Sequence, residues 1–141
     1  MFSKFLAPVD GSENAARALD QALVLAKSTG AAVTAMHVIE RPPTVYVESQ
    51  KVLNELLANY RKESAKILDK CKEAAQKRGV ELETVIAEGD AASNITGYAE
   101  KESFDLIVIG SRGLGKLKEA LLGSTSNKVL HRAKVPVMIV K

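Results

Sequence analysis

The sequence predicts an α/β fold in three layers, an open five-stranded parallel sheet with helices on both faces. Four short apolar runs, and a fifth with rough alternation, are separated along the 141 residues by segments of helical periodicity. Two runs, "LIVI" (Leu106–Ile109) and "VMIV" (Val137–Val140), are apolar without alternation, as in strands covered on both faces. The regular alternation of strand and helix is typical of a parallel sheet.

The first strand and the first helix are expected at Phe5–Val9 and between Ser12 and Thr29. Ser12 is a suitable N-cap, and Gly30 can end the helix. The apolar residues of this segment recur at helical spacing and predict its buried face: Ala15, Leu19, Ala22, Leu23 and Ala26.

The second strand is expected at Ala31–Ile39 and the second helix at Glu48–Arg78, with Gly79 as its end. The connector Glu40–Tyr46 contains two prolines and is expected to be irregular. One apolar stripe along the second helix is expected to pack on the sheet, and it comprises Val52, Leu53, Leu56, Leu57, Tyr60, Ile67, Leu68, Cys71 and Ala75.

The C-terminal half repeats the same pattern of strand and helix. The third helix begins at an N-cap, Asp90, and buries Ala92, Ile95 and Ala99. The fourth helix begins near Leu117 or Ser124, ends near His131, and directs Leu121, Val129 and Leu130 inward. The remaining strands are expected at Val80–Gly89, Phe104–Gly110 and Val135–Val140.

Length and composition indicate one globular domain spanning residues 1–141. Apolar residues make up 46% of the chain and charged residues 26%, which is the balance of a chain with a proper core. Aromatic residues make up 4%, without Trp, and the net charge is only +3. Because stacking on bases needs aromatic side chains, a nucleic-acid partner is not expected.

The cysteine count and the hydropathy exclude further classes. Cys71 is the only cysteine, so neither an intrachain disulfide nor a cysteine zinc cluster is possible. No run approaches the roughly 18 apolar residues of a membrane-spanning helix, and no secretory signal is visible. We therefore expect a cytoplasmic protein with no membrane contact.

The predicted fold places its ligand site at one edge of the sheet. In open parallel sheets, ligands bind beyond the carboxyl ends of the strands, where the strand order reverses. Four stretches are expected there: "VDGSE", "HVIERP", "AEGDAA" and "IGSRGLG".

The last of these stretches almost matches a phosphate-binding loop. Gly110–Lys116 reads G-x-x-x-x-G-K, but Leu117 follows where a magnesium-binding Ser or Thr is required. A conventional phosphate-loop NTPase is thereby excluded. The first turn, "PVDGSE", also lacks the G-x-G-x-x-G of nicotinamide-binding folds.

The stretch nevertheless has the components of an anion site. Gly110 follows a buried strand, where a glycine is expected to turn the chain with positive φ and to let a ligand approach the backbone. Successive N–H groups in such a turn form a concave anion nest. "GSTSN" (Gly123–Asn127) adds hydroxyls and, if a helix begins there, free N–H groups. Two donor clusters could then close on one polyphosphate.

The spacing of these glycines resembles a known family. Gly110-Ser-Arg-Gly113, nine residues, then Gly123-Ser124 is similar to the G-x-x-G, nine residues, G-[S/T] pattern of the ATP-binding branch of the universal stress protein family. "KFLAPVDGSENA", "AMHVIE", "AEGDAASNI" and "VPVMIVK" extend the resemblance over the whole chain. The resemblance implies a UspA-like domain with a Rossmann-like, adenine nucleotide alpha hydrolase-like fold that binds ATP and functions in the stress response.

The resemblance also implies a role for individual residues. Asp10 is implied to lie near the ribose and a metal ion, Mg²⁺ or Mn²⁺ bridging the phosphates, with Pro8 and Val9 lining the cleft. Val38 is implied to pair with adenine through its backbone, and Ala87 and Gly89 to line the adenine side. The phosphate and ribose loop is implied to comprise Gly110, Ser111, Arg112, Gly113, Leu114, Gly115 and Lys116, and the segment that closes on the phosphates Gly123, Ser124, Thr125 and Ser126.

Structural alternatives accompany these assignments. The glycines could be turn residues only, and Asp10 could simply cap the first helix, with Glu13 completing a capping box. His37 and His131 are expected to be structural, because no triad or metal-ligand spacing includes them.

Two functions are compatible with this pattern. The first is an ATP-binding signalling module that presents a surface to an unidentified protein partner. The resemblance implies that this module forms a homodimer through its last strand, and the apolar edge strand Val135–Val140 suits such pairing. The alternative is a slow ATPase or phosphotransferase in which Arg112 or Lys116 supplies charge, although no base accompanies them.

Overall fold

The computed structural model describes residues 2–40, 49–113 and 122–141. Its centre is a sheet of five parallel strands in the order β3-β2-β1-β4-β5. The predicted fold class is confirmed, and each strand lies inside or within one residue of its predicted range. The strands are β1 (Lys4–Pro8), β2 (Ala32–Ile39), β3 (Leu82–Glu88), β4 (Leu106–Gly110) and β5 (Val137–Val140).

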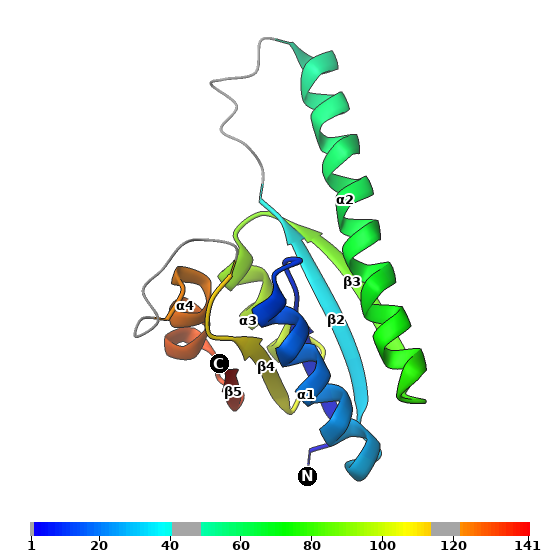
Figure 1. The fold of residues 1–141 in the computed structure, drawn as a ribbon. Helices are drawn as coiled ribbons and strands as arrows, with labels where there is room; N and C mark the ends of the chain where they lie inside the picture. The colour runs from blue at the N-terminus through cyan, green and yellow to red at the C-terminus, as the bar shows by residue number, and fades with distance from the viewer. Residues whose placement is uncertain (1, 41–48, 114–121) are drawn as a thin grey trace.

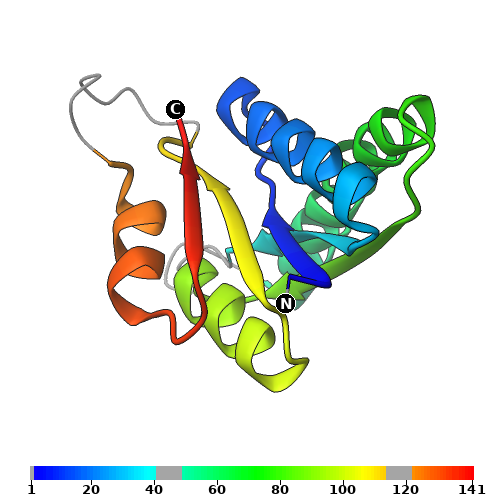
Figure 2. The ribbon, with the colours of Figure 1, turned by 90° about the horizontal axis from the view of Figure 1, so that it is seen from below.

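Four helices cover the two faces of the sheet: α1 (Glu13–Thr29), α2 (Gln50–Lys77), α3 (Ala91–Lys101) and α4 (Ser124–Arg132). Figure 2 shows α1 and α2 on one side of the strands and α3 and α4 on the other. Alternate residues of each strand feed the two cores: Phe5 of β1 packs with α1 and α2, and Leu6 packs with α3 and α4. β4, next to the centre, is buried along its whole length, as its unbroken apolar run predicted.

Helix α1 follows the prediction closely. The hydroxyl of Ser12 accepts a hydrogen bond from Ala15 N–H (3.1 Å), and Gly30 ends the helix in the left-handed conformation at φ 76°. All five apolar residues expected on its inner face are buried. Burial of such small side chains brings α1 close to the sheet.

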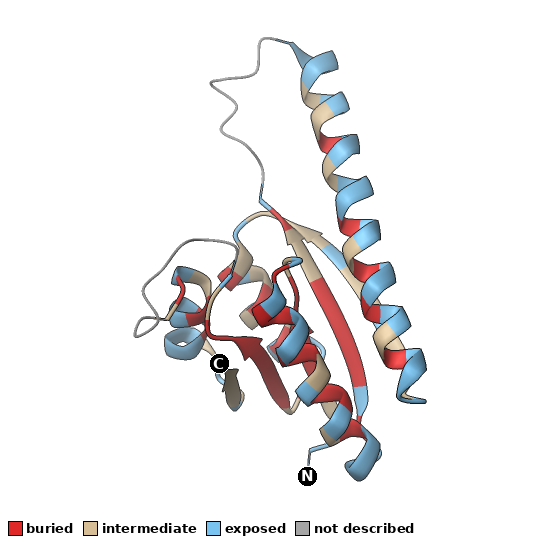
Figure 3. Ribbon diagram, in the orientation of Figure 1, coloured by how far each residue is buried: buried red, intermediate tan, exposed pale blue. Residues whose placement is uncertain are grey.

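The predicted apolar stripe of α2 is wrong at Val52, in the first turn of the helix. Leu57, Leu68, Cys71 and Ala75 are buried, but Val52 is 49% exposed. The reason is length, because a helix of 28 residues extends about 42 Å and the seven residues of β3 about 23 Å. The first turns of α2 therefore project past the sheet, as Figures 1 and 3 show.

Helix α4 begins at Ser124, the later of the two predicted starts, and ends at Arg132. Val129 is fully buried, but Leu130 is 42% exposed, so its predicted inward direction is wrong. Consecutive residues of a helix point about 100° apart, and this short helix packs on the sheet through one narrow stripe. Leu121 lies outside the described residues.

The strand order defines where a ligand site is expected. The chain runs outward from β1 to β2 and β3, returns through α3 to β4, and ends on β5. The reversal therefore lies between β1 and β4, and β3 and β5 form the two edges of the sheet.

Ser103 offers a test of backbone strain in this fold. It follows α3 at φ 58°, and it is the one described residue other than glycine with a positive φ. Because glycine adopts this conformation without steric cost, Ser103→Gly is expected to raise the free energy of unfolding by about 0.5 to 1 kcal/mol.

Urea unfolding measures this change, with Ser103→Ala as the matched control. Alanine removes the hydroxyl but retains the strain, so that variant is expected to gain no stability. Equal stability of the glycine and alanine variants would contradict the strain at Ser103.

Candidate functional site

The predicted site residues of the described strands lie at one rim of the sheet. Pro8 ends β1 and is followed by Val9 and Asp10, while Gly110 ends β4 on the other side of the reversal. The remaining strands bring Val38 of β2 and Ala87 of β3, which are paired in register, and Gly89 just beyond β3. Leu114, Gly115 and Lys116 lie outside the described residues.

The two glycine-bearing segments are in contact. Gly123 N–H donates a hydrogen bond to the carbonyl oxygen of Ser111 (2.7 Å). A side-chain carbon at Gly123 would lie 3.4 Å from Arg112 Cα and 3.5 Å from Gly113 N. The backbone after β4 and the start of α4 therefore form one surface.

The start of α4 differs from the other described helix starts. Ser12, Ser49 and Asp90 each cap their helix through a side-chain hydrogen bond, whereas Gly123 has no side chain to do so. The first N–H groups of a helix have no partner within it. Those at Ser124 and Thr125 can therefore serve an anion at the positive end of the helix dipole.

The hydroxyl of Ser126 makes a hydrogen bond within the protein. Its side chain is 3% exposed, and its hydroxyl donates to the carbonyl oxygen of Gly110 (2.6 Å). This hydrogen bond fixes α4 to the end of β4. Two other hydroxyls at this helix start remain accessible to a ligand, because Ser124 is exposed and Thr125 is half-buried.

Asp10 lies beside Gly113 and the start of α1. Its Oδ1 accepts the N–H of Ser12 (2.9 Å), and Ser12 itself caps α1, so Asp10 is not the cap of that helix. A side-chain carbon at Gly113 would lie 2.6 Å from Asp10 Oδ2. The missing side chain at Gly113 therefore leaves space for the carboxylate.

The role predicted for Gly110 is wrong in one respect. Positive φ values among the described glycines occur at Gly11, Gly30, Gly79 and Gly89, and Gly110 continues β4 without one. Gly110 is required because a side-chain carbon there would collide with Oδ1 of Asn14. Steric contact, and not backbone conformation, excludes a larger residue at this position.

Asn14 is a site residue that the sequence analysis missed. It lies in the first turn of α1 and is only 6% exposed. Its Oδ1 accepts the N–H of Arg112 (2.7 Å), and its Nδ2 donates to the carbonyl oxygen of Val140 (3.3 Å). A signal was available, because Asn14 lies four residues before Ala18 on the buried face of α1.

His37 lies near the rim and is bonded to α2. The hydroxyl of Ser64 donates to Tyr60 O (3.0 Å), so its oxygen accepts from His37 Nδ1 (2.6 Å). Burial lowers the pKa of His37 below its ordinary value of 6.5, and the charge of Asp10 opposes this shift only in part. His37 is therefore held by α2, and burial favours its neutral form. Its purely structural role stays a prediction.

Among the described residues, Asp10 does not belong to a larger group of ligand side chains. Within residues 2–40, 49–113 and 122–141, no three His, Cys, Asp or Glu side chains gather as metal ligands would.

In the same described ranges, no helix has the length and apolarity needed to cross a membrane. Burial raises the pKa of Cys71 to about 11, so this thiol is not a nucleophile.

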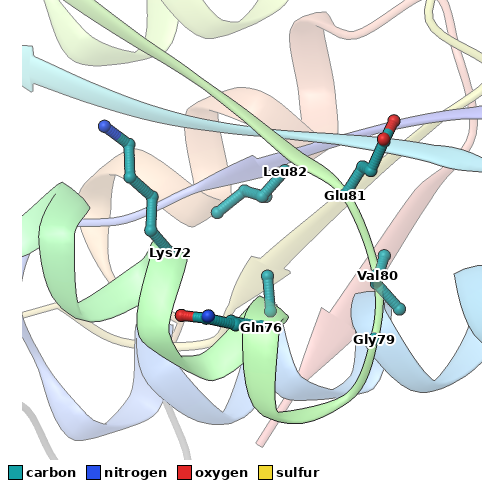
Figure 4. A pocket seen from close by; sticks show the side chains of 7 residues that line it. Lys72, Gln76, Gly79, Val80, Glu81 and Leu82 are labelled. Carbon is teal, nitrogen blue, oxygen red and sulfur yellow. The ribbon is translucent and has the colours of Figure 1, made fainter.

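A pocket lies at the opposite end of the sheet. Figure 4 shows it where α2 ends and β3 begins, lined among others by Lys72, Gln76 and Leu82. This is the amino end of the strands, away from the reversal of strand order, so it does not belong to the rim site.

The fold and this rim define the class of protein: an open-sheet α/β protein with a glycine-bearing loop at the switch point of the strand order. The model of the universal stress protein family matches residues 1–141. The universal stress protein YxiE of Bacillus subtilis is 40% identical over 149 residues, and the match covers both chains completely. The chain belongs to the universal stress protein family.

Solved structures agree with this assignment. Universal stress protein UspA from Lactobacillus plantarum superposes with a TM-score of 0.89 at 27% identity, covering 99% of this chain and 98% of that one. The protein MJ0577 superposes with a TM-score of 0.88 at 32% identity, covering 100% and 96%.

Replacing Ser126 tests the bond between α4 and β4. Ser126→Ala leaves the carbonyl of Gly110 without this donor in a buried position, so the free energy of unfolding is expected to fall by about 1 to 2 kcal/mol. Urea unfolding measures the loss. Ser124→Ala, on the same helix but exposed, is expected to change stability by less than about 0.5 kcal/mol. Equal effects of the two substitutions would contradict the assignment.

His37 predicts a pH dependence of folding. Because its pKa is lower in the folded chain, the unfolded chain binds more protons between the folded pKa and about 6.5. Stability should therefore fall as the pH falls through this window. Urea unfolding at several pH values should show a shallower fall in His37→Gln, which has no titrating group there. If the free energy of unfolding depended on pH identically in both proteins, His37 would not be the cause of that dependence.

Proposed function

We propose that this chain binds ATP at the rim between β1 and β4 and serves as a nucleotide-dependent module of the stress response. The observation that carries the proposal is the contact between the backbone after β4 and the uncapped start of α4. Gly113 and Gly123 are ten positions apart in the sequence, and neither has a side chain. The main-chain N–H groups near each glycine are therefore open to a ligand.

The phosphates are expected to lie against this double segment. Backbone N–H groups at a helix start bind phosphate through hydrogen bonds and the helix dipole. Gly113, Ser124 and Thr125 would supply the donors, and Arg112, Lys116 or both would add positive charge. Ser126 would contribute by holding α4 in place, because its hydroxyl is already donated to Gly110.

Asp10 fits a divalent ion that is shared with the phosphates. Its Oδ1 is held by Ser12, which leaves Oδ2 at the Gly113 side of the cleft. Mg²⁺ is commonly bound by one or two carboxylates together with phosphate oxygens and water. A single carboxylate therefore suffices for Mg²⁺ or Mn²⁺ that arrives with the nucleotide.

The adenine is expected at the side of the rim formed by β2 and β3. Val38 would pair with the base through its backbone, with Ala87 and Gly89 alongside and Pro8 and Val9 as the floor. Two further solved universal stress proteins with the same fold are described as complexes with cAMP and with dAMP, at 24% and 22% identity. Adenine nucleotides are thus ligands of proteins with this fold.

Binding is a better account than turnover. A phosphotransferase needs a group that orients the nucleophile. The imidazole of His37 is bonded to Ser64 on α2, and one oxygen of Asp10 is occupied by Ser12. No specific observation favours the ATPase or phosphotransferase alternative. Nucleotide occupancy would instead order the rim, and the β5 edge would pair with a second copy.

The test begins with the purified protein. Denaturation is expected to release ATP or ADP detectable by chromatography, and calorimetry is expected to show ATP binding. Gly113→Val should weaken ATP binding at least tenfold, which is about 1.4 kcal/mol, because the side chain meets Asp10 and covers the donor backbone.

Gly97→Val is the matched control. Gly97 is exposed in α3 and has open space around it, so this variant should bind ATP like the unsubstituted chain. No binding at millimolar ATP would refute the proposed function. Equal affinity of Gly113→Val and Gly97→Val would refute the placement of the phosphates.

A further inference from the structure

The side chain of Asn14 joins three segments that are far apart in the sequence. It lies in the first turn of α1, accepts from Arg112 N–H beyond β4, and donates to the carbonyl of Val140 at the end of β5. The Val140 carbonyl also accepts the N–H of Ser111 (2.8 Å). One buried amide therefore fixes the backbone of the loop against both a helix and the edge strand.

The Asn14 side chain packs so closely against Gly110 that position 110 has no room for a side chain. A side-chain carbon at Gly110 would collide with Asn14 Oδ1 and lie 3.0 Å from Asn14 Cγ. The amide thus occupies the space that the glycine leaves. Burial of an amide is favourable only when its polar atoms are bonded, and both ends of this one are.

These bonds decide which donors of the loop stay available. Ser111 N–H is taken by Val140 O, and Arg112 N–H is taken by Asn14 Oδ1. Gly113, which follows, is exposed and adjoins both Asp10 and the start of α4. Of the three described residues of this loop, Gly113 is therefore the one whose N–H can face an anion.

We propose that Asn14 is a positioning residue of the nucleotide site, which holds Arg112 N–H in an internal hydrogen bond and thereby directs the backbone N–H of Gly113 toward the phosphates. This role rests on the proposed function. It acts through the loop and requires no contact between Asn14 and the ligand.

Amide hydrogen exchange tests the first half of the proposal without nucleotide. Arg112 N–H should exchange slowly in the unsubstituted chain and at least about tenfold faster in Asn14→Ala, because its acceptor is gone. Asn14→Asp keeps an acceptor oxygen and should restore the protection. Ser12→Ala, which loosens α1 by removing its cap, should leave Arg112 protected.

Calorimetry with ATP tests the second half. Asn14→Ala is expected to lose about fivefold in affinity, the equivalent of one net hydrogen bond. Gly110→Ala displaces the amide and should cause at least a similar loss. Its effect should be smaller in the Asn14→Ala background, where only the contact with the backbone carbon of residue 14 (3.0 Å) remains. If Asn14→Ala does not fold by circular dichroism, Asn14→Ser, whose hydroxyl is too short to reach Arg112, replaces it with the same expectation.

The outcomes are distinguishable. Unchanged exchange at Arg112 in the alanine or serine variant overturns the proposal at its geometric basis. Fast exchange with unchanged ATP affinity overturns the positioning role alone and leaves the proposed function intact. Absence of ATP binding to the unsubstituted chain overturns both, and fast exchange with reduced affinity supports both.

Discussion

The geometry of the rim depends on close backbone approach at positions that lack a side chain. Gly110 admits the amide of Asn14, Gly113 leaves space for the carboxylate of Asp10, and Gly123 lies against the backbone of Arg112 and Gly113. At Gly110 and Gly113 a side-chain carbon would stand less than 3 Å from the neighbouring oxygen. At Gly110 the contact includes a backbone carbon of Asn14 at 3.0 Å, so it cannot be relieved without moving α1 or the end of β4. At Gly113 the contact is with the end of the Asp10 side chain, so a side chain there would displace the carboxylate.

Polar groups of the rim divide into two sets. Ser126, Asn14 and the N–H groups of Ser111 and Arg112 are bonded within the protein and fix α4, β4 and β5 to one another. The second set comprises the uncapped start of α4 and Asp10 Oδ2, which lies on the side of Gly113. A site that binds a highly charged ligand needs the first set to keep the second in place, because loose donors would lose entropy on binding.

The sequence predicted the layers, the order of the elements and the stretches that meet at the rim, because periodicity and parallel topology follow from local patterns. The sequence-based predictions were wrong where the burial or role of a residue depends on a contact with a distant part of the chain. Val52 matched the apolar stripe of α2, but the strand beneath ends before that turn. Gly110 was attributed to backbone conformation, whereas its neighbour is Asn14, nearly a hundred residues earlier in the chain. The helical position of Asn14 indicates that it is buried, but nothing local in the sequence indicates that Gly110 is its partner.

The packing of Asn14 against Gly110 has a consequence for evolutionary variation. Two positions that share one volume cannot vary independently, so a larger residue at 110 requires both a smaller side chain at 14 and a shift of the backbone there. Substitution patterns among relatives should therefore be correlated between these two columns. In chains where position 110 is no longer glycine, the backbone turn beyond β4 must be supported by some other side chain.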